Sequence, residues 1–343
     1  MMHVLVVDDS ALVRQAFSML LTGKFSVDTA ADPLIAERKI RKQRPDVIVL
    51  DLQMPRMDGF SFLRQIMSRD PLPVVICSSA ASRGSETAMR ALEEGAVDVI
   101  AKPPMGVREF IAEGSVMITD TLRAAAQARM RRTMPVVARH APDVIIPAAA
   151  PSLSPATQRI VAMGASTGGT EALRQIIESL PANAPGTVVV QHMPEGFTAA
   201  FAKRLNTLAK VEVKEAVTGD VVEPGRVLIA PGSHHLLVRR SGSRYFVQLS
   251  DGALVSRHRP SVDVLFRSVA QAAGANGIGI ILTGMGDDGA QGLAEMHAAG
   301  ADTIAQDEAT SVIFGMPKEA IQRGAANSVL PLHHIAPAII RLS

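Results

Sequence analysis

The sequence predicts an α/β protein of two domains joined by a linker, and three observations lead to that prediction. The chain has 343 residues, of which 47% are hydrophobic and 20% charged, so it is long enough for two packed cores. In both halves, short apolar runs alternate with amphipathic segments, a pattern typical of parallel sheets covered by helices. Between the halves, residues 132–156 are rich in proline and alanine, a composition that favours a linker over a core.

The first half, residues 1–105, predicts a doubly wound domain with a five-stranded parallel sheet. Amphipathic segments such as 11–21 and 86–94 separate the apolar runs, and prolines and glycines mark their ends. A further helix is expected to continue from residue 106 to about residue 131. The expected strands are 3–7, 25–29, 46–50, 73–77 and 97–101.

The second half, residues 157–343, predicts another α/β domain, with a mostly parallel sheet and a small antiparallel insertion. The expected parallel strands are 160–163, 187–191, 278–283 and 303–306. The expected helices are 170–180, 199–208, 290–299 and 317–323. The antiparallel insertion is expected to contain 226–230, 236–239 and 245–249.

The composition argues against several classes of function. The net charge is only +2, and the chain has one tyrosine and no tryptophan, so we expect no nucleic-acid partner. No apolar run reaches the roughly 18 residues of a membrane span, and no basic segment precedes the first strand, so we expect no membrane insertion and no signal peptide. The single cysteine, Cys77, excludes an internal disulfide, and we expect a cytoplasmic protein.

Polar side chains follow four of the five expected strands of the first half. Asp8 and Asp9 follow the first strand and Asp51 the third, while Ser78 and Lys102 follow the fourth and fifth. The carboxyl ends of parallel strands meet at one edge, and clustered carboxylates there suit Mg²⁺. A carboxylate beside Mg²⁺ can also accept a phosphoryl group. Each acid alone could be a helix cap or a solvated loop charge, but their common placement favours a site.

A serine-hydrolase pattern is present in the second half. Ser166 is the central residue of a G-x-S-x-G segment at 164–168 that lies between an expected strand and an expected helix. His192 directly follows the neighbouring strand and can act as the base that serine needs. Asp287 and Asp288 follow a third strand, and one of them can orient the imidazole.

The same acidic turn admits a rival interpretation. Residues 284–289 fit G-x-G-x-x-G after a strand, and Asp307 lies about 20 residues further on, as in dinucleotide-binding folds. Two carboxylates in the turn would repel a pyrophosphate, which argues against this alternative.

The first half resembles response-regulator receiver domains, on the stretches 6–10, 51–59, 78–79 and 102–103. The resemblance implies that Asp51 accepts phosphate from a histidine kinase and that Asp8 and Asp9, with Asp51, bind Mg²⁺. It further implies that Ser78 is a switch hydroxyl and that Lys102 contacts the phosphate.

The second half resembles the catalytic domain of chemotaxis protein-glutamate methylesterases, on the stretches 164–169, 191–194, 230–235, 259–263 and 282–289. The resemblance implies that Ser166 is the nucleophile, His192 the general base and Asp288 the orienting acid. Asp288 is preferred to its neighbour because it directly precedes Gly289, as in the family pattern.

The resemblance has further implications for the site and its substrate. Thr167 and Met285 match family positions that flank the reacting carbonyl. The implied activity is hydrolysis of glutamate methyl esters on chemoreceptor cytoplasmic domains, with deamidation of receptor glutamines by the same chemistry. We expect the esterase site itself to need no cofactor. His234 and His235 are expected at the rim of this site rather than in a metal centre.

Two foldable domains on a linker suggest a regulatory hypothesis. We expect the unphosphorylated first domain to cover the hydrolase site and phosphorylation of Asp51 to favour an open arrangement. A first domain that drives a non-enzymatic binding output, such as transcriptional control, is the alternative of a different class.

Overall fold

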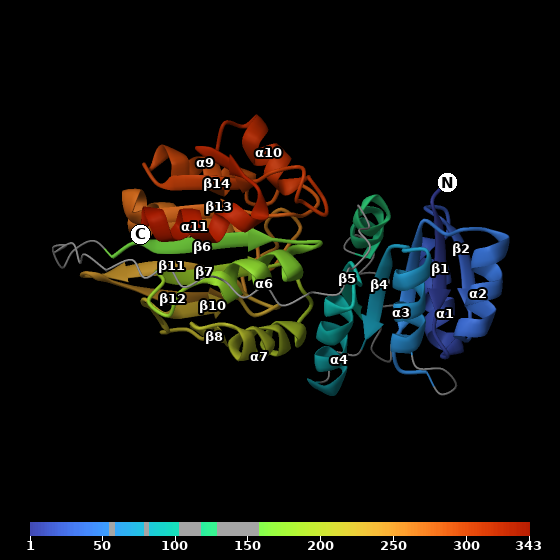
Figure 1. Cartoon of the computed structure of the whole chain (residues 1–343). Helices are drawn as coiled ribbons and strands as arrows, with labels where there is room; N and C mark the ends of the chain where they lie inside the picture. Colours follow the sequence, from blue (N-terminus) through green and yellow to red (C-terminus); the bar gives the residue numbers. More distant parts are fainter. Residues whose placement is uncertain (55–58, 79–81, 103–117, 129–157) are drawn as a thin grey trace, which may run out of the picture.

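The computed structural model describes residues 1–54, 59–78, 82–102, 118–128 and 158–343 (Figure 1). Within them, each half of the chain contains one parallel sheet, and the second half also contains a small antiparallel sheet. The expected linker, 132–156, lies outside the described residues, as does most of the expected helix from 106 to about 131, although residues 118–127 are helical.

The first half contains a five-stranded sheet in the order β2-β1-β3-β4-β5, and all of its pairings are parallel, as predicted. Its strands are β1 (His3–Val7), β2 (Ser26–Ala30), β3 (Val47–Asp51), β4 (Val74–Ser78) and β5 (Asp98–Ala101). Its helices are α1 (Ala11–Leu21), α2 (Pro33–Lys42), α3 (Gly59–Arg69) and α4 (Ser82–Glu93). The strand order reverses at β1, so the carboxyl ends of β1 and β3 lie next to each other.

The second half contains a seven-stranded, fully parallel sheet in the order β15-β14-β13-β6-β7-β10-β8. Its central strands are buried along their whole length, which explains their continuous apolar runs. The strands are β6 (Ile160–Ala165), β7 (Gly186–Gln191), β8 (Glu212–Glu215), β10 (Arg226–Ile229), β13 (Gly277–Ile281), β14 (Asp302–Gln306) and β15 (Ser328–Leu330).

A small antiparallel sheet is present, as predicted, but the prediction that the segment 226–230 belongs to it was wrong. It consists of β9 (Val221–Val222), β11 (His235–Ser241) and β12 (Arg244–Ser250), in the order β11-β12-β9. The segment 226–230, predicted to join it, instead forms β10 of the parallel sheet, where it pairs with β7. Its apolar residues Val227, Leu228 and Ile229 are buried, and only the interior sheet offers that burial on both faces.

Helices cover both faces of the seven-stranded sheet. They are α6 (Gly169–Ser179), α7 (Phe197–Leu208), α8 (Val262–Ala273), α9 (Ala290–Ala298), α10 (Met316–Gln322) and α11 (Leu332–Leu342), with a short 3₁₀ turn at Gly274–Asn276. The prediction did not include α8 and α11. The first of these proves central to the active site. Among the described residues, no helix is both long and apolar enough to cross a membrane.

The two halves contact each other at the carboxyl edge of the second sheet. In Figure 1 the arrowhead of β6 points toward β5 and α4 of the first half. Helix α4 packs against α7, where Lys203 Nζ lies 2.7 Å from Glu86 Oε1 and Arg204 Nε lies 2.5 Å from Glu93 Oε1. Val312 of the second half packs against the core of the first. The contact is therefore partly ionic and partly apolar.

Candidate active site

An acidic cluster lies at the carboxyl edge of the first sheet, as predicted from the strand ends. Oxygen atoms of Asp8, Asp9 and Asp51 all lie within 4.8 Å of one another. Lys102 Nζ lies 2.7 Å from Asp51 Oδ2 and 3.1 Å from Asp8 Oδ2. Ser78 is the buried last residue of β4, the strand between those that carry Asp51 and Lys102.

The electrostatics of the cluster fit a divalent cation. Burial raises the pKa of Asp8, and the neighbouring Asp51 raises it further, although Lys102 opposes both effects. Burial would lower the pKa of Lys102, but its contacts with Asp51 and Asp8 raise it overall. Three hard oxygen donors with one exposed member, Asp9, match the preference of Mg²⁺ for a few carboxylates and several waters.

The second site is built on the turn between β6 and α6. Ser166 directly follows β6, and its backbone N–H donates to Thr283 O at 3.0 Å while its carbonyl accepts from Gly169 N at 2.7 Å. Gly168 has φ 79°, a conformation that residues with side chains rarely adopt. A Cβ atom at Gly284 would lie 2.7 Å from Ser166 Cβ, so this glycine is needed for the close approach of the two segments.

The parallel register brings His192 next to Ser166 at the sheet edge. Ala165 pairs with Gln191 across β6 and β7, and His192 N donates to Ala165 O at 3.1 Å. His192 Nε2 lies 2.8 Å from Asp288 Oδ2, so Nε2 carries the proton of this hydrogen bond. The other nitrogen, Nδ1, is buried and has no hydrogen-bond partner among the described residues. No hydrogen bond joins Ser166 Oγ to His192 in the described part of the chain.

Asp288 is held by the first turn of α8, a helix that was not among those expected from the sequence. Its Oδ1 accepts from Ser261 Oγ at 2.7 Å and from Asp263 N at 3.1 Å, and its Oδ2 also accepts from Val262 N at 2.8 Å. Burial would raise the pKa of Asp288, but the hydrogen bonds from His192, Val262 and Ser261 lower it to about 2. The carboxyl group therefore stays ionised beside the imidazole.

Asp287 and Asp288 have different environments, although they are adjacent in the sequence. The side chain of Asp287 is 62% exposed and pairs with Arg323, whereas that of Asp288 is 2% exposed and pairs with His192. Because Asp288 is bonded to the imidazole and to the N-terminus of α8, the turn 284–289 holds a buried, ionised carboxylate, which would repel a pyrophosphate.

The remaining predicted site residues lie around Ser166. Thr167 is buried, and its Oγ1 donates to Asp98 Oδ2 of β5, in the first half of the chain, at 2.8 Å. Met285 lies half-buried in the loop after β13. Thr283 Oγ1, at the start of that loop, donates to Thr167 O at 3.0 Å.

Three further residues support this site and were not predicted to do so. Ser261 caps α8, and the Pro-Ser-x-Asp pattern at 260–263 is a helix-start signal that could have revealed it. His258 stacks on His192, and no pattern around it indicates this role. His235, expected at the rim, is buried instead, because its Nδ1 accepts from Ser261 N and its Nε2 donates to Ala253 O.

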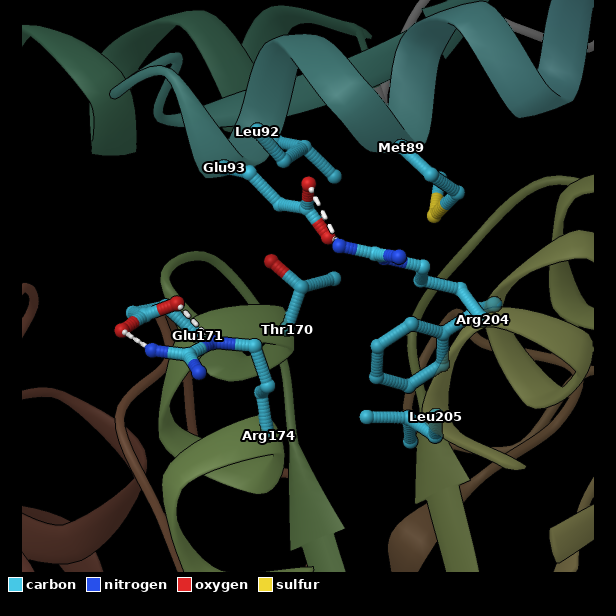
Figure 2. Close-up of a pocket in the computed structure, with 9 residues that line it drawn as sticks. Met89, Leu92, Glu93, Thr170, Glu171, Arg174, Arg204 and Leu205 are labelled. Atoms are coloured by element: carbon cyan, nitrogen blue, oxygen red, sulfur yellow. Dashed lines mark hydrogen bonds and ion pairs between the residues drawn. The ribbon is translucent and has the colours of Figure 1, made fainter. Parts of the chain in front are cut away.

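A crevice opens at the contact between the two halves, away from these residues. Figure 2 shows that its walls come from α4, α6 and α7, with Arg204 paired to Glu93 and Arg174 paired to Glu171. None of Ser166, His192 and Asp288 lines it. The crevice therefore belongs to the contact between the halves rather than to the site around Ser166.

Comparisons with known proteins agree with both halves of this description. Residues 161–339 match the family model described as CheB methylesterase, and residues 4–112 match the response regulator receiver domain. A protein-glutamate methylesterase/protein-glutamine glutaminase of Anaeromyxobacter dehalogenans is 57% identical over 99% of this chain and 96% of its own length. A protein of the same name from Rhodospirillum rubrum is 55% identical over 99% of this chain and 98% of its own length.

A solved structure supports the architecture of the second half. The CheB methylesterase catalytic domain of Thermotoga maritima is 42% identical, with a TM-score of 0.53. The match covers 55% of this chain and all of that one.

Proposed function

Since the chain belongs to the CheB methylesterase family and carries a response regulator receiver domain, we propose that it is a phosphorylation-activated hydrolase of glutamate methyl esters on chemoreceptor cytoplasmic domains. The observation that carries the proposal is the buried His192–Asp288 pair beside Ser166 at one edge of the second sheet. The shared names of its relatives support both the esterase and the glutaminase activity.

The geometry supports Nδ1 of His192 as the proton acceptor of the reaction. Asp288 accepts the Nε2 proton of His192, so Nδ1 is the nitrogen with a free lone pair. A rotation of the Ser166 side chain that brought Oγ to Nδ1 would let the imidazole take the hydroxyl proton as the oxygen attacks the γ-carbonyl. The resulting imidazolium would be stabilised by the ionised carboxylate of Asp288.

The rest of the reaction follows from the same groups. The first amides of α6, next to the Ser166 turn, supply the positive end of a helix dipole where the carbonyl oxygen becomes negative. His192 then returns its proton to the leaving methanol, and a water hydrolyses the acyl-enzyme on Ser166. With a glutamine side chain the leaving group is ammonia, and the product is again glutamate.

Control of the reaction is assigned to the receiver domain. Asp51 would accept the phosphoryl group from a histidine kinase, and Lys102 and Ser78 would contact its oxygens. Asp8, Asp9 and Asp51 would hold Mg²⁺, which neutralises charge during the transfer. A cytoplasmic location is part of this proposal, and the single cysteine, Cys77, is free and buried, as a reducing compartment allows.

The contact between the domains supports inhibition by the unphosphorylated receiver. Thr167, the residue after Ser166, donates a hydrogen bond to Asp98 of β5, so the first domain contacts the turn that carries the nucleophile. Phosphorylation of Asp51 would favour an arrangement in which this edge of the sheet is open.

Methanol release from a methylated receptor cytoplasmic fragment tests the proposal. The full-length protein should release methanol slowly with Mg²⁺ alone and faster after addition of acetyl phosphate. Ser166→Ala should abolish release under both conditions while the melting temperature stays nearly unchanged, because the hydroxyl carries no structural hydrogen bond among the described residues. Undiminished release by Ser166→Ala would overturn the assignment of the nucleophile.

A further inference from the structure

One face of the His192 imidazole is covered by a second imidazole. The ring centroids of His192 and His258 lie 3.7 Å apart, and the two ring planes differ by only 10°. The side chain of His192 is 8% exposed, so His258 forms a substantial part of its surroundings. The in-plane hydrogen bond to Asp288 fixes one edge of the ring, and the stacked ring limits its tilt.

The turn that carries His258 adopts an unfavourable backbone conformation. Val255 and His258 exchange two backbone hydrogen bonds, of 3.1 and 2.9 Å, which close a two-residue turn. The two residues within it, Ser256 and Arg257, have φ angles of 51° and 68°. Glycine, asparagine or aspartate usually occupies such positions, because other side chains are strained there. Such strain persists only where the surrounding structure holds it.

Contacts on both sides hold this turn in place. Arg259 Nη1 donates to Asp251 O at 2.8 Å and to Gly252 O at 3.0 Å. Ser256 Oγ donates to Asp263 Oδ2 at 3.1 Å, which connects the turn to the helix that holds Asp288. Three hydrogen bonds thus hold the loop, and its strained conformation fixes the position of the His258 ring.

His258 presents an uncharged aromatic face. Burial lowers the pKa of His258 to about 3, and His192 and Arg257 add to the effect while Asp288 opposes it. A neutral imidazole can pack against the neutral base, and it can also stabilise a cation above its π-system. A protonated ring in the same place would repel the imidazolium that forms on His192 during the reaction.

We propose that His258 is a positioning residue for the esterase reaction: its stacked ring keeps the His192 imidazole in the plane that connects Asp288 with Ser166 and stabilises the charge that His192 acquires. The inference rests on the proposed function and deepens it. It assigns to a residue outside the Ser–His–Asp set a share in the chemical step but no contact with substrate.

Kinetics of the full-length, acetyl phosphate-activated protein test this role, with a methylated receptor fragment as substrate. His258→Ala should lower kcat about tenfold and leave KM within about twofold, because the stacked ring acts on the base and not on substrate binding. His258→Phe, which keeps an aromatic face without ring nitrogens, should restore most of the lost kcat. His334→Ala removes a histidine of another ring pair, on the remote helix α11, and should leave both constants unchanged.

Several outcomes would overturn the proposal. A wild-type kcat in His258→Ala would show that the stacked ring does not contribute, and equal losses in the Ala and Phe variants would show that its face is not what matters. If the Ala variant is unstable, His258→Leu replaces it, since leucine fills the space without a π-system. A wild-type kcat in that variant would likewise overturn the proposal. These results are distinct from failure of the proposed function, which would appear as activity in Ser166→Ala.

Discussion

The acidic cluster of the receiver domain and the active site of the esterase domain each contain a buried carboxylate at the carboxyl edge of a parallel sheet. The two sites differ in the groups that stabilise the negative charge of this carboxylate. In the receiver, burial and the nearby Asp51 raise the pKa of Asp8, while Lys102 and the backbone amide of Ser10 oppose both effects. In the esterase, amides of α8, Ser261 and His192 surround Asp288 and lower its pKa to about 2.

The difference lies in what surrounds each carboxylate. The esterase domain supplies every hydrogen bond that its carboxylate needs, so its geometry is set before substrate arrives. The receiver cluster leaves three acids together with one lysine, an arrangement that favours a divalent cation and a phosphoryl group. The esterase site is thus preorganised, whereas the charge of the receiver cluster would change on binding of a cation or a phosphoryl group.

The same substitution, Asp to Asn, should have different consequences in the two sites. Asp288→Asn should lower esterase activity about a thousandfold, with or without acetyl phosphate, because an amide cannot stabilise the imidazolium as a carboxylate does. Asp51→Asn should leave the unphosphorylated rate nearly unchanged and remove the response to acetyl phosphate. Steady-state methanol release from both variants provides the comparison. A full phosphodonor response in Asp51→Asn would contradict the assigned phosphoacceptor.

Removal of divalent cations should separate the two sites chemically. In excess EDTA, acetyl phosphate should no longer raise the rate of methanol release, whereas the unphosphorylated rate should stay within about twofold of its value with Mg²⁺. Restoring Mg²⁺ should restore the response. Loss of the unphosphorylated rate in EDTA would mean that the esterase site also depends on a metal.

The contact of Asp98 with Thr167 between the two domains predicts that inhibition of the esterase by the unphosphorylated receiver depends on pH. Burial raises the pKa of Asp98 to about 6, although hydrogen bonds from Val99 and Thr167 oppose this. The closed arrangement therefore holds the Asp98 proton more tightly than the open one. The closed arrangement therefore loses stability relative to the open one as the pH rises from about 4 to about 6, and the balance between the two arrangements changes little at higher pH.

The non-ionisable variant Asp98→Asn provides the reference for this effect. From pH 5 to pH 7, the unphosphorylated rate of the wild type divided by that of Asp98→Asn should rise about fivefold. The ratio cancels titration of groups that the two proteins share. A constant ratio would show that Asp98 does not ionise in the contact.

The smallest effect is expected from the ion pairs between α4 and α7. Lys203 and Glu86 are largely exposed, so Lys203→Glu should raise the unphosphorylated rate by only about twofold. The exchanged pair, Lys203→Glu with Glu86→Lys, should return the rate to the wild-type value. If the double variant is as active as the single one, the two side chains do not interact across the contact.

The sequence predicted the parallel sheets and the residues at their edges because both are properties of local patterns. Apolar runs located β6, β7 and β13, and the residues after them include Ser166, His192 and Asp288. Since parallel strands end at one edge, the spatial proximity of His192 and Asp288 followed from that placement.

Contacts that depend on tertiary packing could not be predicted in this way. The short strand β8 carries charged residues and resembles a loop in sequence, yet it pairs with β10 at the sheet edge. His258 lies in a loop and His235 at the start of β11, and only the tertiary fold brings both of them to the site. The contact of Asp98 with Thr167 joins two domains, whose arrangement no periodicity encodes.

The shared use of Ser261 and Asp288 makes α8 sensitive to acid. Ser261 Oγ both caps the helix and donates to the carboxylate, and two amides of the first turn rely on the same carboxylate. Because the pKa of Asp288 is lowered in the folded state, its ionised carboxylate stabilises that state at pH values above the ordinary pKa of aspartate. This stabilisation is lost as the pH falls toward about 2. Acid inactivation should therefore begin with fraying at one end of a single helix, and neutralisation should return activity without refolding of the whole domain.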